Sequence, residues 1–315
     1  MTIEVQQYLT KGSFGHIYLG SASNNEPTDW MEKKVVIKVD KNIASVVWEC
    51  YIHTLLKHRS SKSDSTVYSN HYLEPMCLIL YSNVSVMCME YAVYGTLHDA
   101  IIVLSKQQLS GKDHELVCLN FANDMMKVLG HLHHHKIIHS DIKTNNWVVK
   151  QDVVTHKLML MLIDFGKAKD TQVTGKQANI LYTGSSSASG FKCPAMLDGS
   201  TWSYEADYYS ALVCIHQSLY YQPMSTISKV NRDEVRRFGY DNELRALGPY
   251  IIPTTAIKRY WIRDLWSATY YILLNESNTP SSVRELCAML EANISLNEAV
   301  MADALRIFTN YLQKI

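Results

Sequence analysis

Two short segments contain residue types suited to moving a phosphoryl group. Residues 139–146 read His-Ser-Asp-Ile-Lys-Thr-Asn-Asn, and residues 164–166 read Asp-Phe-Gly. Asp141 can accept a hydroxyl proton, and Lys143 can sit against a phosphate in transfer. Asn146 and Asp164 supply the hard oxygen ligands that Mg²⁺ prefers. Residues 147–163 are long enough for two short strands that would bring the two segments together.

The two segments, in this order and at this separation, resemble the catalytic loop and the metal-binding triplet of eukaryotic protein kinases. The resemblance implies ATP and Mg²⁺ as cofactors. It also implies in-line attack by a substrate hydroxyl on the γ-phosphate, with Asp141 as the proton acceptor. Lys143, two residues after Asp141, favours a serine or threonine as the acceptor.

The residues near the N-terminus resemble the glycine-rich loop of the same family. Residues 11–18 read Lys-Gly-Ser-Phe-Gly-His-Ile-Tyr, between stretches at 3–9 and 16–20 that alternate like strands. Glycine lets a backbone approach phosphates closely because it has no side chain. Thr10 stands where the family's first glycine usually lies, which predicts a stiffer loop. The resemblance assigns cofactor binding here to Gly12, Ser13, Phe14 and Gly15.

An apolar strand at 35–38, Val-Val-Ile-Lys, resembles the family's third strand. The resemblance assigns Lys38 to the α- and β-phosphates. A helical pattern follows at 44–58, and Glu49 falls where the family's C-helix glutamate belongs. Trp48 and Ile52 form part of an apolar stripe near Glu49, so this face of the helix is predicted to pack on the sheet. An ion pair between Glu49 and Lys38 is therefore expected.

A buried strand at 85–89 and the residues after it resemble the hinge that meets adenine. In this assignment Met89 occupies the gatekeeper position at the back of the pocket. The backbone of the hinge would contact the base. The resemblance thus adds three cofactor-binding residues: Met89, Glu90 and Ala92.

Strand patterns dominate up to about residue 89 and helical patterns from about residue 97, which predicts an α+β fold. The helical patterns lie at 113–135, 202–221, 233–247, 260–274, 281–290 and 298–312. We expect a two-lobed, protein kinase-like fold, with an antiparallel-sheet N-lobe carrying the C-helix and a mainly helical C-lobe. The predicted organisation is a single kinase domain over 1–315, with the N-lobe at 1–89, the hinge at 90–95 and the C-lobe at 96–315. With 315 residues, the chain can bury a sizeable core.

Composition narrows the classes of partner. Lys plus Arg equals Asp plus Glu at 30 each, so no dedicated nucleic-acid or membrane surface is expected. No stretch approaches the roughly 18 apolar residues of a membrane helix. The seven cysteines show no Cys-x-x-Cys pair and lie mostly in apolar segments. Free cysteines of this kind are typical of a reducing, intracellular compartment.

Three stretches are similar to the Bub family of mitotic spindle-checkpoint kinases. They are Trp-Glu-Cys-Tyr-Ile at 48–52, Tyr-Gly-Thr-Leu-His-Asp-Ala-Ile at 94–101, and Ser-Gly-Phe-Lys-Cys at 189–193 followed by Trp-Ser-Tyr at 202–204. The resemblance runs over the whole chain. It implies checkpoint and kinetochore proteins as partners, and a location in the nucleus, at kinetochores and in the cytoplasm.

Two functional classes remain open. One is an active serine/threonine kinase, which the intact catalytic residues favour. The other is a pseudokinase or scaffold domain, because one branch of the Bub family includes members that have lost catalytic residues. Ser140 replaces the arginine that commonly precedes the catalytic aspartate, so activation should not depend on a phosphate paired there. Ala195 lacks the carboxylate of the family's Ala-Pro-Glu motif, so the usual buried pair that braces the activation segment is absent.

Other residues have structural and functional interpretations. Asp207 matches the family's F-helix aspartate that anchors the catalytic loop, or it is a first-turn acid of its helix. The histidines at 131, 133, 134, 135 and 139 are better explained by a helix end than by zinc. The apolar face of 298–312 is expected to pack on the helical lobe, with binding of a partner the less favoured alternative. Hydroxyl residues at 171–189 are expected mostly as an ordinary loop, with phosphorylation there the less favoured alternative.

Overall fold

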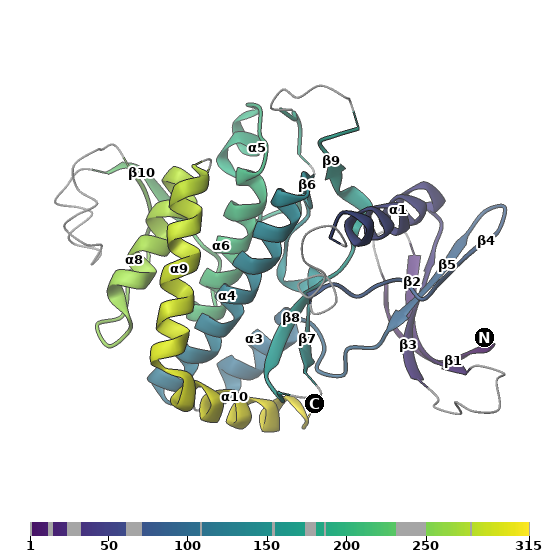
Figure 1. Ribbon diagram of the computed structural model, residues 1–315, viewed down its shortest axis with the longest axis horizontal. Helices are drawn as coiled ribbons and strands as arrows, with labels where there is room; N and C mark the ends of the chain where they lie inside the picture. The colour runs from purple at the N-terminus through teal and green to yellow at the C-terminus, as the bar shows by residue number, and fades with distance from the viewer. Residues whose placement is uncertain are drawn as a thin grey trace. The chain divides into compact units, whose positions relative to one another are not determined.

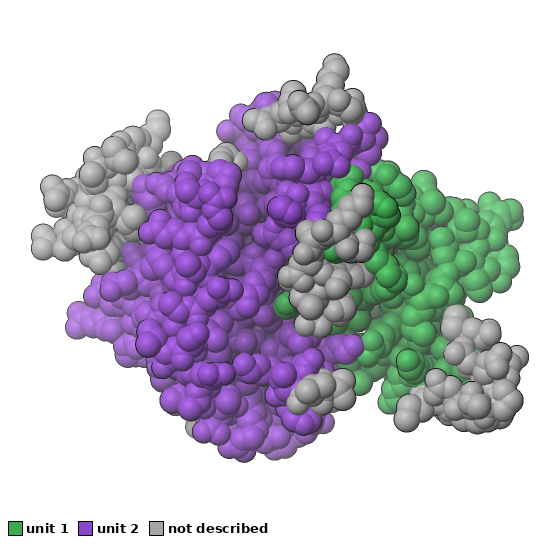
Figure 2. All heavy atoms as spheres, in the orientation of Figure 1, with its two compact units in different colours: residues 1–93, 161–168 green, residues 94–160, 169–315 purple. Residues whose placement is uncertain are grey.

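The structure is a computed structural model that describes residues 2–11, 15–23, 33–60, 71–107, 109–152, 155–173, 181–185, 187–230, 250–277 and 279–314. The chain divides into two compact units, which Figure 2 colours separately. Unit 1 comprises residues 1–93 and 161–168, and unit 2 comprises residues 94–160 and 169–315. The assignment of one kinase domain with a hinge at 90–95 stays a prediction.

Unit 1 is built on an antiparallel sheet with the strand order β1-β2-β3-β5-β4. The described part of this unit also contains a long helix, α1 (Figure 1), and a short 3-10 turn, η2. The predicted strands and the predicted helix are all present. Their bounds are β1 Thr2–Lys11, β2 Gly15–Ser23, β3 Lys33–Asp40, α1 Ile43–Ser60, β4 Cys77–Leu80, β5 Ser85–Glu90 and η2 Phe165–Lys167.

Strand alternation decides which face of the sheet each residue of β3 occupies. Val35 and Ile37 point to one face, where they pack in an apolar cluster with Cys88. Lys38 therefore points to the opposite face. The register pairs Lys38 with Met87, and Met87 packs against Val46 of α1. The single lysine of this apolar strand thus lies on the side of the sheet that α1 covers.

Unit 2 is mainly helical. Among its described elements, α4 contacts α6, α9 and α10, and Figure 1 shows α4, α6 and α9 side by side. Short strands pair as β6 with β9, β7 with β8 and β10 with β11. The last two residues of β8 belong to unit 1. The bounds are α3 Leu97–Lys106, α4 Gly111–His134, β6 Ile137–Ile138, η1 Thr144–Asn146, β7 Trp147–Gln151, β8 Leu158–Leu162, β9 Lys169–Asp170, α5 Pro194–Asp198, α6 Glu205–Tyr220, β10 Thr226–Val230, β11 Tyr250–Pro253, α8 Arg263–Tyr271, η4 Ile272–Glu276, α9 Pro280–Leu296 and α10 Glu298–Leu312.

Local sequence signals explain where several helices begin. Thr96 and Asp99 form a capping box at the start of α3, because each side chain accepts the other residue's backbone N–H. Ser110 caps α4 by accepting the N–H of Asp113. Pro280 opens α9, where its missing N–H is not needed.

The apolar face of α10 packs on the helices of unit 2, as predicted. Met301, Leu305 and Phe308 are buried, and the ring of Phe308 lies 6.2 Å from that of Phe121 in α4. The predicted helix at 202–221 begins later, at Glu205. The reason is that Trp202 instead exchanges two backbone hydrogen bonds with Tyr182.

The helical pattern expected at 233–247 lies outside the described residues. Within the described part of the chain, no helix combines the length and apolar character needed to cross a membrane. All seven cysteines are free thiols, as their apolar surroundings predicted.

Candidate active site

Lys38 in unit 1 contacts two carboxylates. Its Nζ lies 2.9 Å from Oε2 of Glu49 and 3.0 Å from Oδ1 of Asp164. The expected ion pair between Lys38 and Glu49 is therefore present. The second Glu49 oxygen, Oε1, accepts the backbone N–H of Phe165 at 3.3 Å. The strand, the helix and the Asp-Phe-Gly triplet are thus joined through one lysine and one glutamate.

Burial makes this network sensitive to the loss of any member. The Glu49 side chain is 1% exposed and that of Lys38 is 14% exposed, whereas that of Asp164 is 39% exposed. Burial by itself would lower the pKa of Lys38. The carboxylates of Glu49 and Asp164 outweigh that effect and hold the pKa of Lys38 above its ordinary value. Lys38 is therefore a fixed cation beside a carboxylate that solvent can reach.

The Asp-Phe-Gly triplet is held in an uncommon backbone conformation. Asp164 has a φ of 67°, in the left-handed region that non-glycine residues rarely adopt. Phe165 is fully buried, and the ring of His53 packs edge-on against it at 4.8 Å. Trp48 of α1 donates its indole N–H to the backbone oxygen of Ala168 at 2.8 Å. Helix α1 therefore contacts the middle residue of the triplet and the backbone just after it.

The predicted nucleotide-contacting residues of unit 1 lie on the sheet and at its edges. Met89 is buried in β5 beside Val46, and Ala92 is also buried. Glu90 is the exposed last residue of β5. Gly15 begins β2, and a Cβ there would collide with the backbone oxygen of Val39. Three of the loop residues, Gly12, Ser13 and Phe14, lie outside the described residues.

The catalytic-loop residues of unit 2 are clustered and mostly buried. Nζ of Lys143 lies 3.1 Å from Oδ2 of Asp141, whose side chain is 3% exposed. Asn146 donates from its amide nitrogen to the backbone oxygen of Asp141 at 2.9 Å. That bond orients the Asn146 side chain and leaves its amide oxygen as the group available to a metal. Asp141, Lys143 and Asn146 are therefore brought together.

A buried aspartate of α6 holds this loop. Asp207 accepts the backbone N–H groups of His139 and Ser140, both at 2.7 Å. Ser140 has a φ of 60°, so the loop is strained at the residue before Asp141. The carboxylate does not bond to its own helix in these contacts. The predicted anchoring role of Asp207 is confirmed over the alternative of a simple first-turn acid.

The sequence interpretation missed one functional candidate, His133. Its Nε2 lies 3.0 Å from Oδ2 of Asp207, and its ring packs at 4.7 Å against both Tyr204 and Tyr208. From the sequence, the histidines at 131–135 and 139 were assigned together to a helix end. A usable signal was its position, because His133 lies in the last turn of a helix that leads into the loop. Among the residues that the structure describes, no cluster of three metal-ligating side chains was found.

Packing, rather than an ion pair at residue 195, holds the described end of the activation segment, residues 181–185 and 187–196. Cys193, Met196, Trp202 and Ala206 form an apolar cluster with Ile138 of β6. Further hydrogen bonds join the same segment to its surroundings. Trp202 donates its indole N–H to the oxygen of Gly184 at 2.7 Å, Ser210 donates to that of Phe191 at 2.8 Å, and Ser187 donates to that of Ser140 at 3.1 Å.

Comparisons with known proteins agree with this geometry. A family profile described as "Protein kinase domain" matches residues 3–252. The mitotic checkpoint serine/threonine-protein kinase BUB1 of Arabidopsis thaliana is 26% identical over 290 residues, covering 88% of this chain and 50% of that protein. The spindle assembly checkpoint serine/threonine-protein kinase BUB1 of Saccharomyces cerevisiae is 27% identical over 289 residues, covering 85% of this chain and 25% of that protein.

A solved structure supports the fold. The crystal structure of the BubR1 kinase domain matches with a TM-score of 0.76 at 24% identity, covering 99% of this chain and 85% of that one. The predicted α+β, protein kinase-like fold is confirmed, and so is the resemblance to the Bub family. The chain spans about half, or a quarter, of the length of these two curated relatives.

Proposed function

The chain belongs to the protein kinase family, and we propose that it is a serine/threonine protein kinase that transfers the γ-phosphate of ATP to protein hydroxyls in spindle-checkpoint signalling. The observation that carries the proposal is the contact of Lys38 with both Glu49 and Asp164. A buried lysine that is held between two carboxylates is the arrangement that a nucleotide phosphate and its metal require. The checkpoint role follows the printed names of the relatives.

The residues present fit magnesium and ATP, the cofactors that protein kinase domains generally use. Asp164 offers a carboxylate that is 39% exposed, and Asn146 offers an amide oxygen. Both are hard oxygen donors of the kind that Mg²⁺ prefers. Bound Mg²⁺ would neutralise phosphate charge as it develops during transfer. Lys38 would hold the α- and β-phosphates, and the backbone near Met89, Glu90 and Ala92 would meet the base.

The chain's own side chains supply the remaining steps. Asp141 would accept the proton of the substrate hydroxyl as that oxygen attacks the γ-phosphate in line. Lys143, 3.1 Å from Asp141, would stabilise the negative charge on the transferred group. The bonds from His139 and Ser140 to Asp207 would keep Asp141 in place between turnovers.

Partners and location belong to the same proposal. Protein substrates and checkpoint or kinetochore proteins are inferred as partners, and kinetochores, the nucleus and the cytoplasm as locations. The alternative function is a scaffold domain without turnover, which Thr10, Ser140 and Ala195 keep open. Against it, the apolar cluster around Trp202 fixes the activation segment without the carboxylate that residue 195 lacks.

The deciding experiment is phosphate transfer from labelled ATP to the chain itself and to a generic serine/threonine substrate. Parent protein is compared with Asp164→Asn and Lys38→Arg, each checked for folding by circular dichroism. Transfer that both variants lose by about a hundredfold or more supports the kinase. No transfer by folded parent protein above the variants would overturn the enzyme and leave the scaffold. Nucleotide binding alone does not discriminate, because a scaffold domain can also bind ATP.

A further inference from the structure

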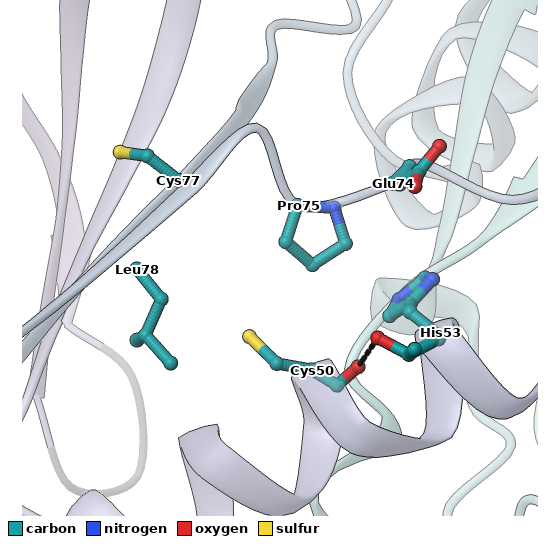
Figure 3. A pocket seen from close by; sticks show the side chains of 7 residues that line it. Cys50, His53, Glu74, Pro75, Cys77 and Leu78 are labelled. Carbon is teal, nitrogen blue, oxygen red and sulfur yellow. Dashed lines mark hydrogen bonds between the residues drawn. The ribbon is translucent and has the colours of Figure 1, made fainter.

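Outside the candidate site, a cavity in unit 1 and a surface patch in unit 2 present side chains that the proposed mechanism does not use. The cavity has a volume of about 180 Å³ and is lined by residues of α1 and by residues 74–78 (Figure 3). Two of its polar side chains already have partners in the chain: Thr54 donates to the Cys50 oxygen at 2.9 Å, and Glu74 pairs with Lys57 at 2.8 Å. The patch in unit 2 differs, because several of its charged side chains lack such partners.

The patch is formed around the first turn of α4 by two exposed tyrosines. Tyr260 is 59% exposed, and its ring lies directly over Gly111, where a Cβ would collide with it. Tyr221 is 41% exposed, and its ring packs at 5.0 Å against that of His114, one turn further along α4. Burial raises the pKa of the Tyr221 hydroxyl, and the nearby Cys118 thiol and Tyr260 hydroxyl raise it further. The two phenol rings are therefore neighbours on one surface.

The backbone at Tyr221 is unusual for a tyrosine. Tyr221 is the C-cap of α6 and has a φ of 59°, in the left-handed region where glycine or asparagine is usual. Its hydroxyl donates to the backbone oxygen of Leu104 in α3 at 3.2 Å, which fixes the direction of the ring. The ring is thus held in one position although much of it faces solvent. A surface that is ordered before binding loses less freedom when a partner arrives.

Cations surround the two rings. The ammonium of Lys258 lies 4.7 Å from the centre of the Trp261 ring and 6.0 Å from that of Tyr260. Arg259 is exposed beside it, and Lys106 is the last residue of α3, in the turn that the other tyrosine contacts. Within the described residues, Lys258, Arg259 and Lys106 have no carboxylate partner. Their charges are therefore available to a ligand.

Carboxylates are fewer on the same turns. Glu115 is fully buried and pairs with Lys112 at 3.5 Å. Asp113 is exposed on the first turn of α4, and Asp264 is exposed on the first turn of α8, where Arg263 precedes it. Residues 104–106, 110–115, 220–222 and 258–264 together contain five cations and three carboxylates. The patch is therefore complementary in charge to an acidic partner.

A protein segment fits this surface better than a nucleic acid. Binding a nucleic acid typically requires a groove of cations that follows the phosphates. Here the cations instead surround two rings, and the whole chain has as many acidic as basic residues. An apolar side chain flanked by carboxylates has the complementary chemistry, because its centre would cover the rings and its ends would meet the charged rim.

The patch lies far from the loop at 139–146. It surrounds the first turn of α4, and the loop follows the last turn of the same helix, which has 24 residues. At 1.5 Å per residue, the helix separates them by about 35 Å. A segment bound at the patch would therefore leave the candidate active site open.

We propose that this patch is a docking surface for an acidic segment of a partner protein, in which one aromatic or aliphatic side chain packs on the two tyrosine rings while flanking carboxylates pair with Lys258, Arg259 and Lys106. Any effect on phosphorylation rests on the proposed function, whereas binding of the segment does not. The tests below therefore use no ATP.

The binding test uses the full chain and a dye-labelled peptide of glutamates around one central phenylalanine. Fluorescence anisotropy should show saturable binding, with a dissociation constant on the order of 0.1 mM. Raising NaCl from about 0.1 to about 1 M should weaken it by about fivefold or more. The same peptide with alanine in place of phenylalanine should bind about fivefold more weakly. Absent saturation, or equal binding of the two peptides, overturns the site.

The charge test compares two double variants that remove the same charge. Lys258→Gln with Arg259→Gln should weaken peptide binding by about tenfold. Lys314→Gln with Arg284→Gln is the matched control, because Lys314 also lies over a tyrosine ring, at 5.6 Å, and Arg284 is likewise exposed. The control should bind within about twofold of the parent. Equal binding by the two double variants would show that only net charge matters, and would overturn the patch.

The ring test uses Tyr260→Ala, which should weaken peptide binding by about fivefold. Tyr81→Ala in unit 1 is the matched control, because Tyr81 is 57% exposed and Tyr260 is 59% exposed. Both variants are checked for folding by circular dichroism. Equal binding by folded Tyr260→Ala and Tyr81→Ala would overturn the role of the ring.

Two other occupants are distinguished by the same variant. A single-stranded oligonucleotide that binds more tightly than the peptide, and is lost in Tyr260→Ala, would indicate a nucleic-acid surface. Self-association of the parent in sedimentation, abolished by Tyr260→Ala, would indicate a second copy of the chain. Either result would overturn the acidic segment as the occupant.

Discussion

The two units each hold one strained residue beside a candidate catalytic group, but they hold it by different means. In unit 1, Asp164 at φ 67° is fixed through its side chain by Lys38. In unit 2, Ser140 at φ 60° is fixed through its backbone N–H by Asp207. A buried carboxylate, Glu49 or Asp207, stands behind each arrangement. Charge pairing therefore holds Asp164 in unit 1, and backbone hydrogen bonding holds the loop at 139–146 in unit 2.

This difference predicts that removing Asp207 from unit 2 lowers the free energy of unfolding more than removing the charge of Glu49 in unit 1. Asp207→Ala leaves the buried N–H groups of His139 and Ser140 without their acceptor. The expected loss is about 3–5 kcal/mol in the free energy of unfolding, measured by urea denaturation. Asp207→Asn keeps one acceptor oxygen and should lose less. Equal stability of Asp207→Ala and the parent would show that the loop is held by other contacts.

Acid should act on unit 2 through His216, on the same helix as Asp207. Burial lowers the pKa of His216 from its ordinary 6.5 to about 4. The unfolded chain therefore binds a proton that the folded chain refuses between these values, so stability falls as pH drops from 6.5 towards 4. At pH 4 this proton uptake lowers the free energy of unfolding by about 3 kcal/mol. His216→Gln should flatten the pH dependence of unfolding in this window, and a slope identical to the parent's would contradict the assignment.

In unit 1, Glu49→Gln tests the charge pairing directly. The variant keeps the shape of the side chain, and Lys38 retains Asp164 as a partner. We expect a loss of about 2–3 kcal/mol in the free energy of unfolding. We also expect phosphate transfer to slow by about tenfold or more, because Lys38 is no longer held in register. Unchanged kcat/KM would show that Asp164 alone positions the lysine.

His133 tests the unit 2 arrangement less directly, because it contacts Asp207 and not the loop that Asp207 holds. His133→Ala removes the contact at 3.0 Å to Asp207 and should cost about 1–2 kcal/mol. We expect kcat to fall more than KM rises, because the effect reaches Asp141 through the loop. The exposed neighbour provides the control, and His134→Ala should match the parent in both measurements. A KM effect without a kcat effect would rule out this role.

The smallest effect is expected at the activation segment. Ser187 is buried and donates to the backbone oxygen of Ser140 at 3.1 Å, so Ser187→Ala should cost about 1 kcal/mol. Ser185 is exposed, and Ser185→Ala should change nothing in thermal unfolding. A phosphate on Ser187 would have to displace this contact. Loss of activity in Ser185→Ala would indicate instead that an exposed hydroxyl is modified.

Much of the fold was predictable because its signals are local. Period-two alternation indicated the strand with Lys38, and an apolar stripe near Glu49 indicated α1. The end of α10 and the long α4 followed from periodicity in the same way. The predicted start of the helix near 202 was wrong by three residues, because backbone pairing of Trp202 with Tyr182 is a contact that periodicity does not encode.

In the candidate site, too, the residues close together in sequence were predictable and those with distant partners were not. The spacing of Asp141, Lys143 and Asn146 was sufficient to predict that they act together, since a short loop cannot separate them far. His133 was missed because its partner Asp207 lies 74 residues away in the chain. The roles of Gly12, Ser13 and Phe14 remain predictions that the described residues do not address.

The sequence by itself determined which chemistry is available: a lysine, two candidate metal ligands, and an aspartate with a lysine two positions on. It also determined the order of strands and helices, because both depend on neighbours a few residues apart. Only the tertiary structure decided how these groups are held. Lys38 meets Asp164 across 126 residues of sequence, and the cluster of Trp202 with Ile138 braces the segment that Ala195 cannot. Such contacts depend on how distant elements pack, which no local pattern encodes.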